Sequence, residues 1–404
     1  MPRWQNAHCQ GAEVNRRLFN HRMKGGDPSF IPGRKSNAGD LVMDAGTVQG
    51  VAVGCSVSLH QSNLLPTPGQ PNDSLGTLIV TAVKSTSATL AFQSLPPAGS
   101  GSAPIPFTLS SLPRLFYCRI SQRPPQSLTI SSNDLQWLES TFNHEFCVSL
   151  SLTITTHTKT ADLVFIRDGD VVHLDHNLNL AVSHIGTRSP YTIRDNDIGL
   201  LHRVVQCAIG FRFHLLRTNI GPSPNFDLKM EFHELRMSFD SKLGFGEKPS
   251  GRDLFEKDPA IVEVKEDKQY GLTIHNFSNE WLYPHLFYFD PSELSITFWY
   301  LPPTGAGSSS SHKTDAALSP KSDFTIGFGK GGVSPWEFIL PNGLTKDVGF
   351  FKLFVTTVPA DLRSILQDSP YDSSDSGYNR SGQSAGNIEI EGLWDTVLKT
   401  VVQV

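Results

Sequence analysis

The stretch SNEWLYPHLFYFDPSELSITFWYLPP spans residues 278–303 and holds eight aromatic residues between Trp281 and Tyr300. Alternate residues of each half share one face of a strand: Tyr283, His285, Phe287 and Phe289, then Leu294, Ile296, Phe298 and Tyr300. The sequence Asp-Pro-Ser-Glu at 290–293 places Asp first and Pro second, as a β-turn favours. The stretch therefore predicts an antiparallel hairpin that is packed on both sides.

The sequence on either side of this hairpin has the same period of two. Residues 226–237 (FDLKMEFHELRM) and 270–278 (YGLTIHNFS) alternate, and 322–329 and 347–357 supply later strands. Together these segments predict an antiparallel β-sandwich over residues 226–358.

Different patterns appear before residue 226. Four short strands with Gly turns between residues 38 and 94 predict a small β-barrel. In the middle region, residues 131–142 suggest a short helix with a capping box from Asn133 to Gln136, and residues 147–156 and 161–175 read as strands with a hairpin at Asp168-Gly169. Residues 195–216 carry the best helical stripe, behind Asp195 and Asp197. The expected fold class is mainly β with some α (α+β).

The predicted division of the chain has six parts: an arm at 1–37, a small β-barrel at 38–94, a linker at 95–125, a mixed α/β region at 126–225, an antiparallel β-sandwich at 226–358, and a flexible tail with a short terminal element at 359–404. Two low-complexity segments, 302–320 and 368–387, are expected to be flexible and to be cut first by proteases.

Composition and charge narrow the function classes. The net charge of -5 and a pI near 6.3 predict no nucleic-acid partner and no attraction to an anionic membrane. The N-terminus lacks the apolar core of a secretory signal, and no apolar run is long enough to span a bilayer. Five scattered cysteines without a C-x-x-C pair fit free thiols in a reducing, cytoplasmic setting.

Three short sequence patterns are considered as possible chemical sites, and none of them favours a binding or catalytic role. Gly327, Gly329 and Lys330 lie in GFGKGGVSPW, whose spacing fits a turn better than a phosphate loop. His173, Asp175, His176 and His184 resemble a metal set, but exposed strand histidines are far commoner. Cys9 in AHCQG has no strand before it to position a nucleophile. We therefore expect no catalytic, cofactor-binding or metal-ligating residue.

Residues 2–20, PRWQNAHCQGAEVNRRLFN, resemble a segment near the downstream end of the peptidase domain in caspase-like proteins of mushroom-forming fungi. The matching residues are Gln5, Cys9, Gly11, Asn15, Arg16, Leu18 and Phe19, while Ala7 and Gln10 replace the usual Pro and Glu. Residues 43–59, 281–303, 324–332, 347–371 and 394–403 are similar, in order, to motifs of the long C-terminal extension of those proteins.

The resemblance implies a cysteine-type endopeptidase family but carries over no catalytic residue. Peptidases of the family use a histidine in a His-Gly pair and a cysteine after a buried strand, and this sequence has no His-Gly pair. We expect a non-catalytic C-terminal regulatory or interaction region, whose partner is a caspase-like catalytic domain or another protein. One alternative is a portion of an active peptidase whose catalytic domain lies upstream. Another is a ligand- or glycan-binding sandwich that uses Trp281, Trp299 and Trp336.

Overall fold

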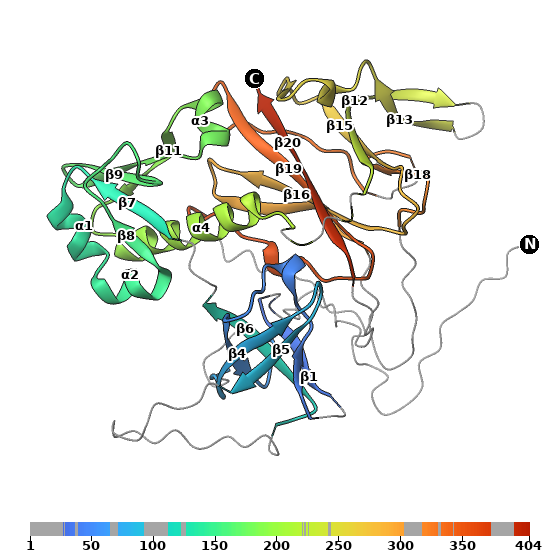
Figure 1. Ribbon diagram of the computed structural model, residues 1–404. Helices are drawn as coiled ribbons and strands as arrows, with labels where there is room; N and C mark the ends of the chain where they lie inside the picture. Colours follow the sequence, from blue (N-terminus) through green and yellow to red (C-terminus); the bar gives the residue numbers. More distant parts are fainter. Residues whose placement is uncertain are drawn as a thin grey trace, which may run out of the picture.

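The computed structural model describes residues 27, 29–36, 39–64, 72–92, 112–122, 127–219, 221, 224, 226–240, 244–302, 317–329, 333–341, 343–372 and 392–404. The fold is α+β and mainly β, as predicted, with a barrel followed by three open sheets (Figure 1). The predicted arm before residue 27 and most of the two low-complexity segments lie outside the described residues.

A closed six-stranded barrel begins the described part of the chain. Its strands, in spatial order, are β1 (Ile31–Lys35), β2 (Leu41–Met43), β5 (Ala88–Phe92), β4 (Gly76–Val83), β3 (Ser56–His60) and β6 (Leu115–Gln122). Strands β1 and β6 close it, and a Cβ at Gly33 would lie 2.2 Å from the Phe116 ring, so glycine lets the closing strands approach. The predicted limits of 38–94 were therefore too narrow, because the closing strands fall in the predicted arm and linker.

A mixed five-stranded sheet, called here the middle sheet, follows the barrel. Its order is β11 (Arg188–Arg194), β10 (Val171–His176), β9 (Leu163–Asp168), β7 (Leu128–Ser132) and β8 (Leu152–Ile154). The associated helices are α1 (Leu135–Thr141), α2 (His144–Leu150), α3 (Asn179–Ile185) and α4 (Ile198–Leu216). The strand prediction for 147–156 was wrong over its first half, because the Asn143 side chain caps α2 at the Phe146 N–H. The cap of α1 is Asp134 rather than Asn133.

Two further sheets form the predicted sandwich. The outer sheet has the order β13 (Gly244–Ser250), β12 (Leu228–Asp240), β15 (Gln269–Asn276) and β18 (Ser322–Ile326). The central sheet has the order β14 (Ala260–Val262), β20 (Trp394–Gln403), β19 (Asp347–Thr356), β16 (Tyr283–Asp290) and β17 (Ser295–Tyr300). The pairing is antiparallel except between β14 and β20. The ten residues of β20 lie inside this sheet, so the tail predicted from residue 359 in fact ends in a core strand.

The central sheet is buried on both faces. Leu286 of β16 and Phe351 of β19 pack toward the outer sheet, while Phe287 and Phe350 pack toward α4 and the middle sheet. The rings of Phe211 in α4 and Phe289 in β16 lie 5.6 Å apart. Figure 1 shows α4 running from the middle sheet across to the central sheet. The expectation of a hairpin packed on both sides is confirmed.

One residue of that hairpin departs from the predicted face. The register of β16 with β17 shifts, so that Leu286 pairs with Tyr300 while Phe287 pairs with Phe298. The extra residue, Trp299, is a β-bulge, and it turns Tyr300 toward the outer sheet, away from the face shared by Ile296 and Phe298.

Side chains and backbone groups join the barrel to the sandwich. The Trp394 indole N–H of β20 donates to the Thr47 hydroxyl over 2.9 Å, and the Gln49 side-chain amide donates to the Asp361 carbonyl over 3.3 Å. Thr47 and Gln49 bound the short 3-10 helix η1 (Thr47–Gln49), and two other 3-10 turns are η3 (Leu254–Glu256) and η4 (Arg363–Ile365). The barrel is thus hydrogen-bonded to the terminal strand and to the segment before η4.

Candidate functional site

The turn of the aromatic hairpin brings together two aspartates, Asp290 and Asp347, and burial raises the pKa of both. Asp290 ends β16, and its Oδ1 accepts hydrogen bonds from the N–H groups of Ser292 and Glu293 at 2.9 and 3.0 Å. The chain then passes through Leu294, whose φ of 49° lies in the left-handed region. The predicted turn is confirmed, with Asp290 as its capping residue.

Asp347, the first residue of β19, lies beside this turn. Its side chain is almost fully buried, and Oδ1 accepts from the Ser292 hydroxyl and from the Val348 N–H, both at 2.8 Å. Its Oδ2 has no hydrogen-bond partner among the described residues. A buried carboxylate oxygen without a donor is costly, so burial raises the pKa of Asp347.

The two aspartates act on each other. Burial first, and the charge of Asp347 second, raise the pKa of Asp290 to about 7. Two neighbouring carboxyl groups in a poorly solvated position ionise one after the other, because the second charge is opposed by the first. The pair therefore favours a protonated form up to nearly neutral pH.

Glu293 links the same turn to the middle sheet. Its Oε1 accepts from the Tyr191 hydroxyl of β11, and its Oε2 accepts from the Ser369 hydroxyl at 2.8 Å. The rings of Tyr191 and Tyr371 stack with centroids 4.1 Å apart. Burial, followed by the bond to Glu293, raises the pKa of Tyr191. The turn thus joins three segments, at β11, at β16–β17 and at 367–372.

This arrangement has little capacity for catalysis. The Ser292 hydroxyl is buried and donates to Asp347, and none of the described histidines is hydrogen-bonded to it. A serine nucleophile needs such a base and an open approach for substrate. The carboxyl cluster is therefore best explained as a polar joint between segments.

A buried lysine makes a second joint. Lys352 of β19 is buried and donates to three carbonyls at the C-terminal end of α4: those of His214 at 3.1 Å, of Leu215 at 2.6 Å, and of the C-cap residue Arg217. These carbonyls have no acceptor role within the helix, and a cation suits the negative end of the helix dipole. Burial first, then Arg217, lowers the pKa of Lys352 to about 7.

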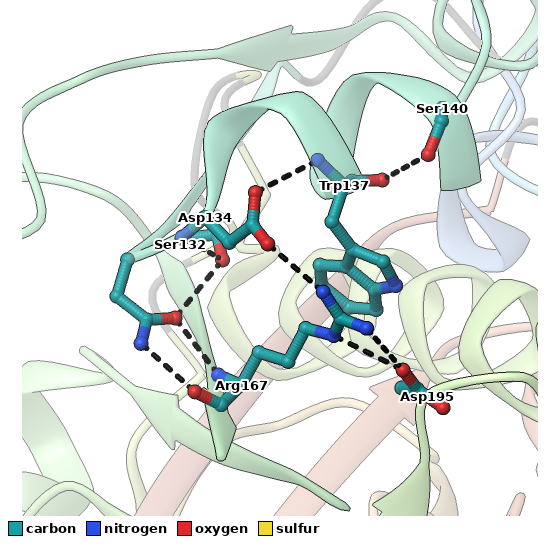
Figure 2. A network of polar contacts seen from close by, with 7 residues as sticks. Ser132, Asp134, Trp137, Ser140, Arg167 and Asp195 are labelled. Carbon is teal, nitrogen blue, oxygen red and sulfur yellow. Dashed lines mark hydrogen bonds and ion pairs between the residues drawn. The ribbon is translucent and has the colours of Figure 1, made fainter. Parts of the chain in front are cut away.

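A third polar network lies at the end of β9, the central strand of the middle sheet. Figure 2 shows the Arg167 guanidinium of β9 between Asp134, which caps α1, and Asp195, which precedes α4. The nitrogen–oxygen distances are 3.0 Å to Asp134 and 2.6 Å to Asp195, and the Trp137 ring centroid is 5.9 Å from the guanidinium carbon. The backbone N–H of Trp137 and then Arg167 lower the pKa of Asp134. The network fixes α1 against the sheet.

The histidines considered for a metal site are not brought together. His173 and Asp175 do lie on the same face of β10, but Asp175 pairs with Arg188. His176 faces the opposite side and is buried, and burial lowers its pKa. His184 lies in the last turn of α3. Across the described residues, no group of three or more histidine, cysteine or acidic side chains has an arrangement suited to a metal ion.

The remaining residues that the sequence suggested as binding or catalytic candidates differ in how exposed they are. Among the tryptophans, Trp299 is buried and Trp336 packs against it in the sandwich core with centroids 5.3 Å apart, whereas Trp281 is 57% exposed. Gly327 and Gly329 have positive φ, as expected of a turn, and Lys330 lies outside the described residues. Cys9 is also outside them.

Three of the four thiols that the structure describes are shifted away from reactivity. Burial raises the pKa of Cys118 and of Cys147, and it raises the pKa of Cys207 to about 11. A nucleophilic thiol needs the opposite shift.

Sequence reasoning missed Asp347 and Lys352. Both occur in the run DVGFFKLFVTT, where a charged residue interrupts an otherwise apolar strand. A charged residue within a fully buried strand must have specific partners, so the sequence could have identified both residues as candidates for buried polar contacts. The partners themselves come from residues 292 and 214–217, which the sequence does not connect.

Comparison with family models and with curated proteins gives no match to this chain. No helix in the described part of the chain is long and apolar enough to cross a membrane.

Proposed function

We propose that this chain is a non-catalytic regulatory and interaction region of a caspase-like cysteine peptidase. The observation that carries the proposal is the position of the motifs that resemble that family's extension. Residues 281–303, 347–362 and 394–403 supply β16, β17, β19 and β20, which are neighbours in the central sheet. Motifs far apart in sequence thus belong to one structural unit, as expected of a shared domain.

The polar clusters also support a structural and binding role. Their charged groups are engaged in internal joints, with Arg167 on two aspartates and Lys352 on three helix carbonyls. The proposed partner is a caspase-like catalytic domain or another protein. We place the chain in the cytoplasm, since its free thiols suit a reducing compartment.

The first test is peptidase activity of the purified chain on Arg-, Lys- and Asp-directed peptides. The expected result is no thiol-dependent cleavage. A Cys9→Ala variant is the matched control, and activity that this change abolishes would refute the non-catalytic assignment.

The second test is binding. Titrating a separately purified caspase-like catalytic domain with this chain should yield a complex and change the rate of peptide cleavage. Absence of both effects contradicts the regulatory role.

The alternative of an active peptidase portion has its own measurement. The intact mass of the native protein, captured through its C-terminal half, separates the two readings. A mass near 44.4 kDa supports a chain without a catalytic part, and a product heavier by a domain of about 100–250 residues supports the alternative. The glycan-binding alternative now depends on Trp281, since Trp299 is buried and Trp336 is partly buried against the sandwich core.

A further inference from the structure

Residues 367–372 form a short strap that lies against the turn of the aromatic hairpin. The first residue of the strap is fixed to the backbone of its neighbours, since Gln367 exchanges backbone hydrogen bonds with Ile296 of β17 at 2.8 and 3.1 Å. The Gln367 side-chain amide also donates to the carbonyl of Leu294 at 2.6 Å and to that of Cys207 in α4 at 2.9 Å. None of these bonds involves a titratable side chain, so this anchor holds independently of pH.

The rest of the strap is held mainly by one carboxylate and by two stacked rings. The Ser369 hydroxyl donates to Glu293 Oε2 at 2.8 Å, while Glu293 Oε1 accepts from the Tyr191 hydroxyl of β11. The Tyr371 ring stacks on the Tyr191 ring with centroids 4.1 Å apart and 15° between the planes, and Tyr371 also shares a hydrogen bond with the Ser189 side chain. Glu293 therefore holds the strap, since it bonds both Ser369 and the tyrosine on which Tyr371 stacks.

Several carboxyl groups lie around this contact. Burial is the first cause that raises the pKa of Asp290 and of Asp347, and the charge of Glu293 adds to both shifts. In the strap itself, burial and then the charge of Asp372 raise the pKa of Asp368. Within the described residues, Asp290, Asp347 and Glu293 accept hydrogen bonds from hydroxyl and backbone N–H groups, and not from a lysine or arginine. The other titratable groups near them are Tyr288 of β16, Tyr191 of β11, Cys207 and Arg203 of α4, and Tyr371 of the strap.

We propose that the strap opens and closes with pH: it is closed while the pair of Asp290 and Asp347 keeps a proton, and it opens when both are ionised. Three carboxylates then crowd one turn, and like charges in a poorly solvated position repel one another strongly. Glu293 is the member that can leave, because it bonds only side-chain hydroxyls among the described residues, whereas the two aspartates accept from backbone N–H groups. Its departure frees the strap to turn about Gln367 and exposes the two stacked tyrosine rings.

The direction of the pH effect follows from the closed form. The pKa of Asp290 is raised there from 3.8 to about 7, so the closed form keeps a proton that an open, hydrated turn has lost. Opening therefore becomes more favourable as pH rises from about 4 to about 7, by at most about tenfold per pH unit for one proton, and levels off above that range. Burial raises the pKa of Tyr191 and of Tyr371, so both remain protonated throughout the range. Acidification thus tightens the strap.

Native-state hydrogen exchange of the full chain tests the opening of the strap. Mass spectrometry of peptides that cover residues 368–372 gives the protection factor of their amides, corrected for the intrinsic effect of pH on exchange. Between pH 5 and pH 7 this protection factor should fall by about tenfold or more. The fall should be the same without urea and in about 1 M urea, because opening of a short strap exposes little surface, whereas the protection of β19 should decrease with urea. A strap whose protection does not change with pH, or decreases with urea as that of β19 does, overturns the proposal.

Charge-neutral variants identify the proton that controls the strap. Asp290→Asn keeps an acceptor for the N–H groups of the turn but cannot ionise, so the protection of the strap should change by less than about threefold between the same two pH values. Asp168→Asn, at an exposed position at the end of β9, is the matched control and should keep the full fall. Asp347→Asn replaces Asp290→Asn if circular dichroism shows that the latter does not fold. A full fall in the neutral variant that folds contradicts the proposal.

Discussion

A single methyl group at Gly349 tests the packing between β19 and β16. A Cβ added there lies 2.0 Å from the Tyr288 hydroxyl oxygen and 2.3 Å from its Cζ. Tyr288 is only 7% exposed, and Trp336 and Phe351 lie 5.0 and 5.2 Å from it, ring centre to ring centre. The ring cannot move aside without displacing the core.

The cost of Gly349→Ala has two parts. Overpacking a well-packed core costs about 1–3 kcal/mol. The displaced Tyr288 hydroxyl also loses the hydrogen bond that the Gln403 side-chain amide donates over 2.7 Å, which is worth about 1 kcal/mol. We therefore expect the free energy of unfolding to fall by roughly 2–4 kcal/mol.

Urea denaturation measures this loss, with Gly76→Ala as the matched control. Gly76 also lies in a strand, but nothing lies within 4 Å of a Cβ placed there, so its substitution should change stability by less than about 1 kcal/mol. In a Tyr288→Leu background, Gly349→Ala should likewise cost less than about 1 kcal/mol, because the clashing atoms are gone. Equal effects of the two glycine substitutions in the native background would refute the register of β16 on β19.

Three further predictions concern the polar joints. The pKa of Asp290 is raised from 3.8 to about 7, so the folded chain binds a proton that the unfolded chain has already lost. The free energy of unfolding therefore falls as pH rises from 3.8 to about 7. Asp290→Asn should remove roughly 1–3 kcal/mol of this fall, allowing for solvent screening, as measured by urea titrations at pH 4 and 8. The pKa of Lys352 is lowered from 10.5 to about 7, so between these values the unfolded chain binds the extra proton and the free energy of unfolding rises with pH. Lys352→Met should abolish a rise of roughly 3–5 kcal/mol in the same assay at pH 7 and 10. Thr47→Val leaves the Trp394 indole N–H unpaired and should cost about 1–3 kcal/mol in thermal unfolding.

The aromatic hairpin could be predicted because its information is local. Period-two alternation, a turn with Asp290 first, and aromatic residues on both faces define two paired strands without reference to the rest of the chain. The bulge at Trp299 could not be predicted. It depends on how β17 meets β16, and the residue types alone do not record a register shift.

The barrel limits show what local reasoning leaves out. Strand β1 pairs with β6, so that Ile31 lies opposite Cys118 across more than 80 intervening residues. Neither strand is strongly marked in the sequence, because β1 contains Pro32 and Gly33 and β6 contains Arg119. These two segments form strands because they close the barrel, and not because their residues strongly favour strands. Each one provides hydrogen-bond partners for a sheet edge that would otherwise be unpaired.

The candidate site was missed because the partners of its residues are known only once the sheets and helices are placed against one another. The strand pattern of 347–357 indicates burial on both faces but does not say what covers each face. The structure places α4 on the face of Lys352, where carbonyls at the end of the helix accept hydrogen bonds from its amino group, and places the hairpin turn beside Asp347. A buried lysine at the end of a helix and a buried aspartate at a turn are each tolerable for a different reason, one by the helix dipole and one by protonation. Because Asp290 and Lys352 have opposite pH dependence, comparing Asp290→Asn with Lys352→Met separates the two joints in one set of measurements, even though β19 contributes a residue to each joint.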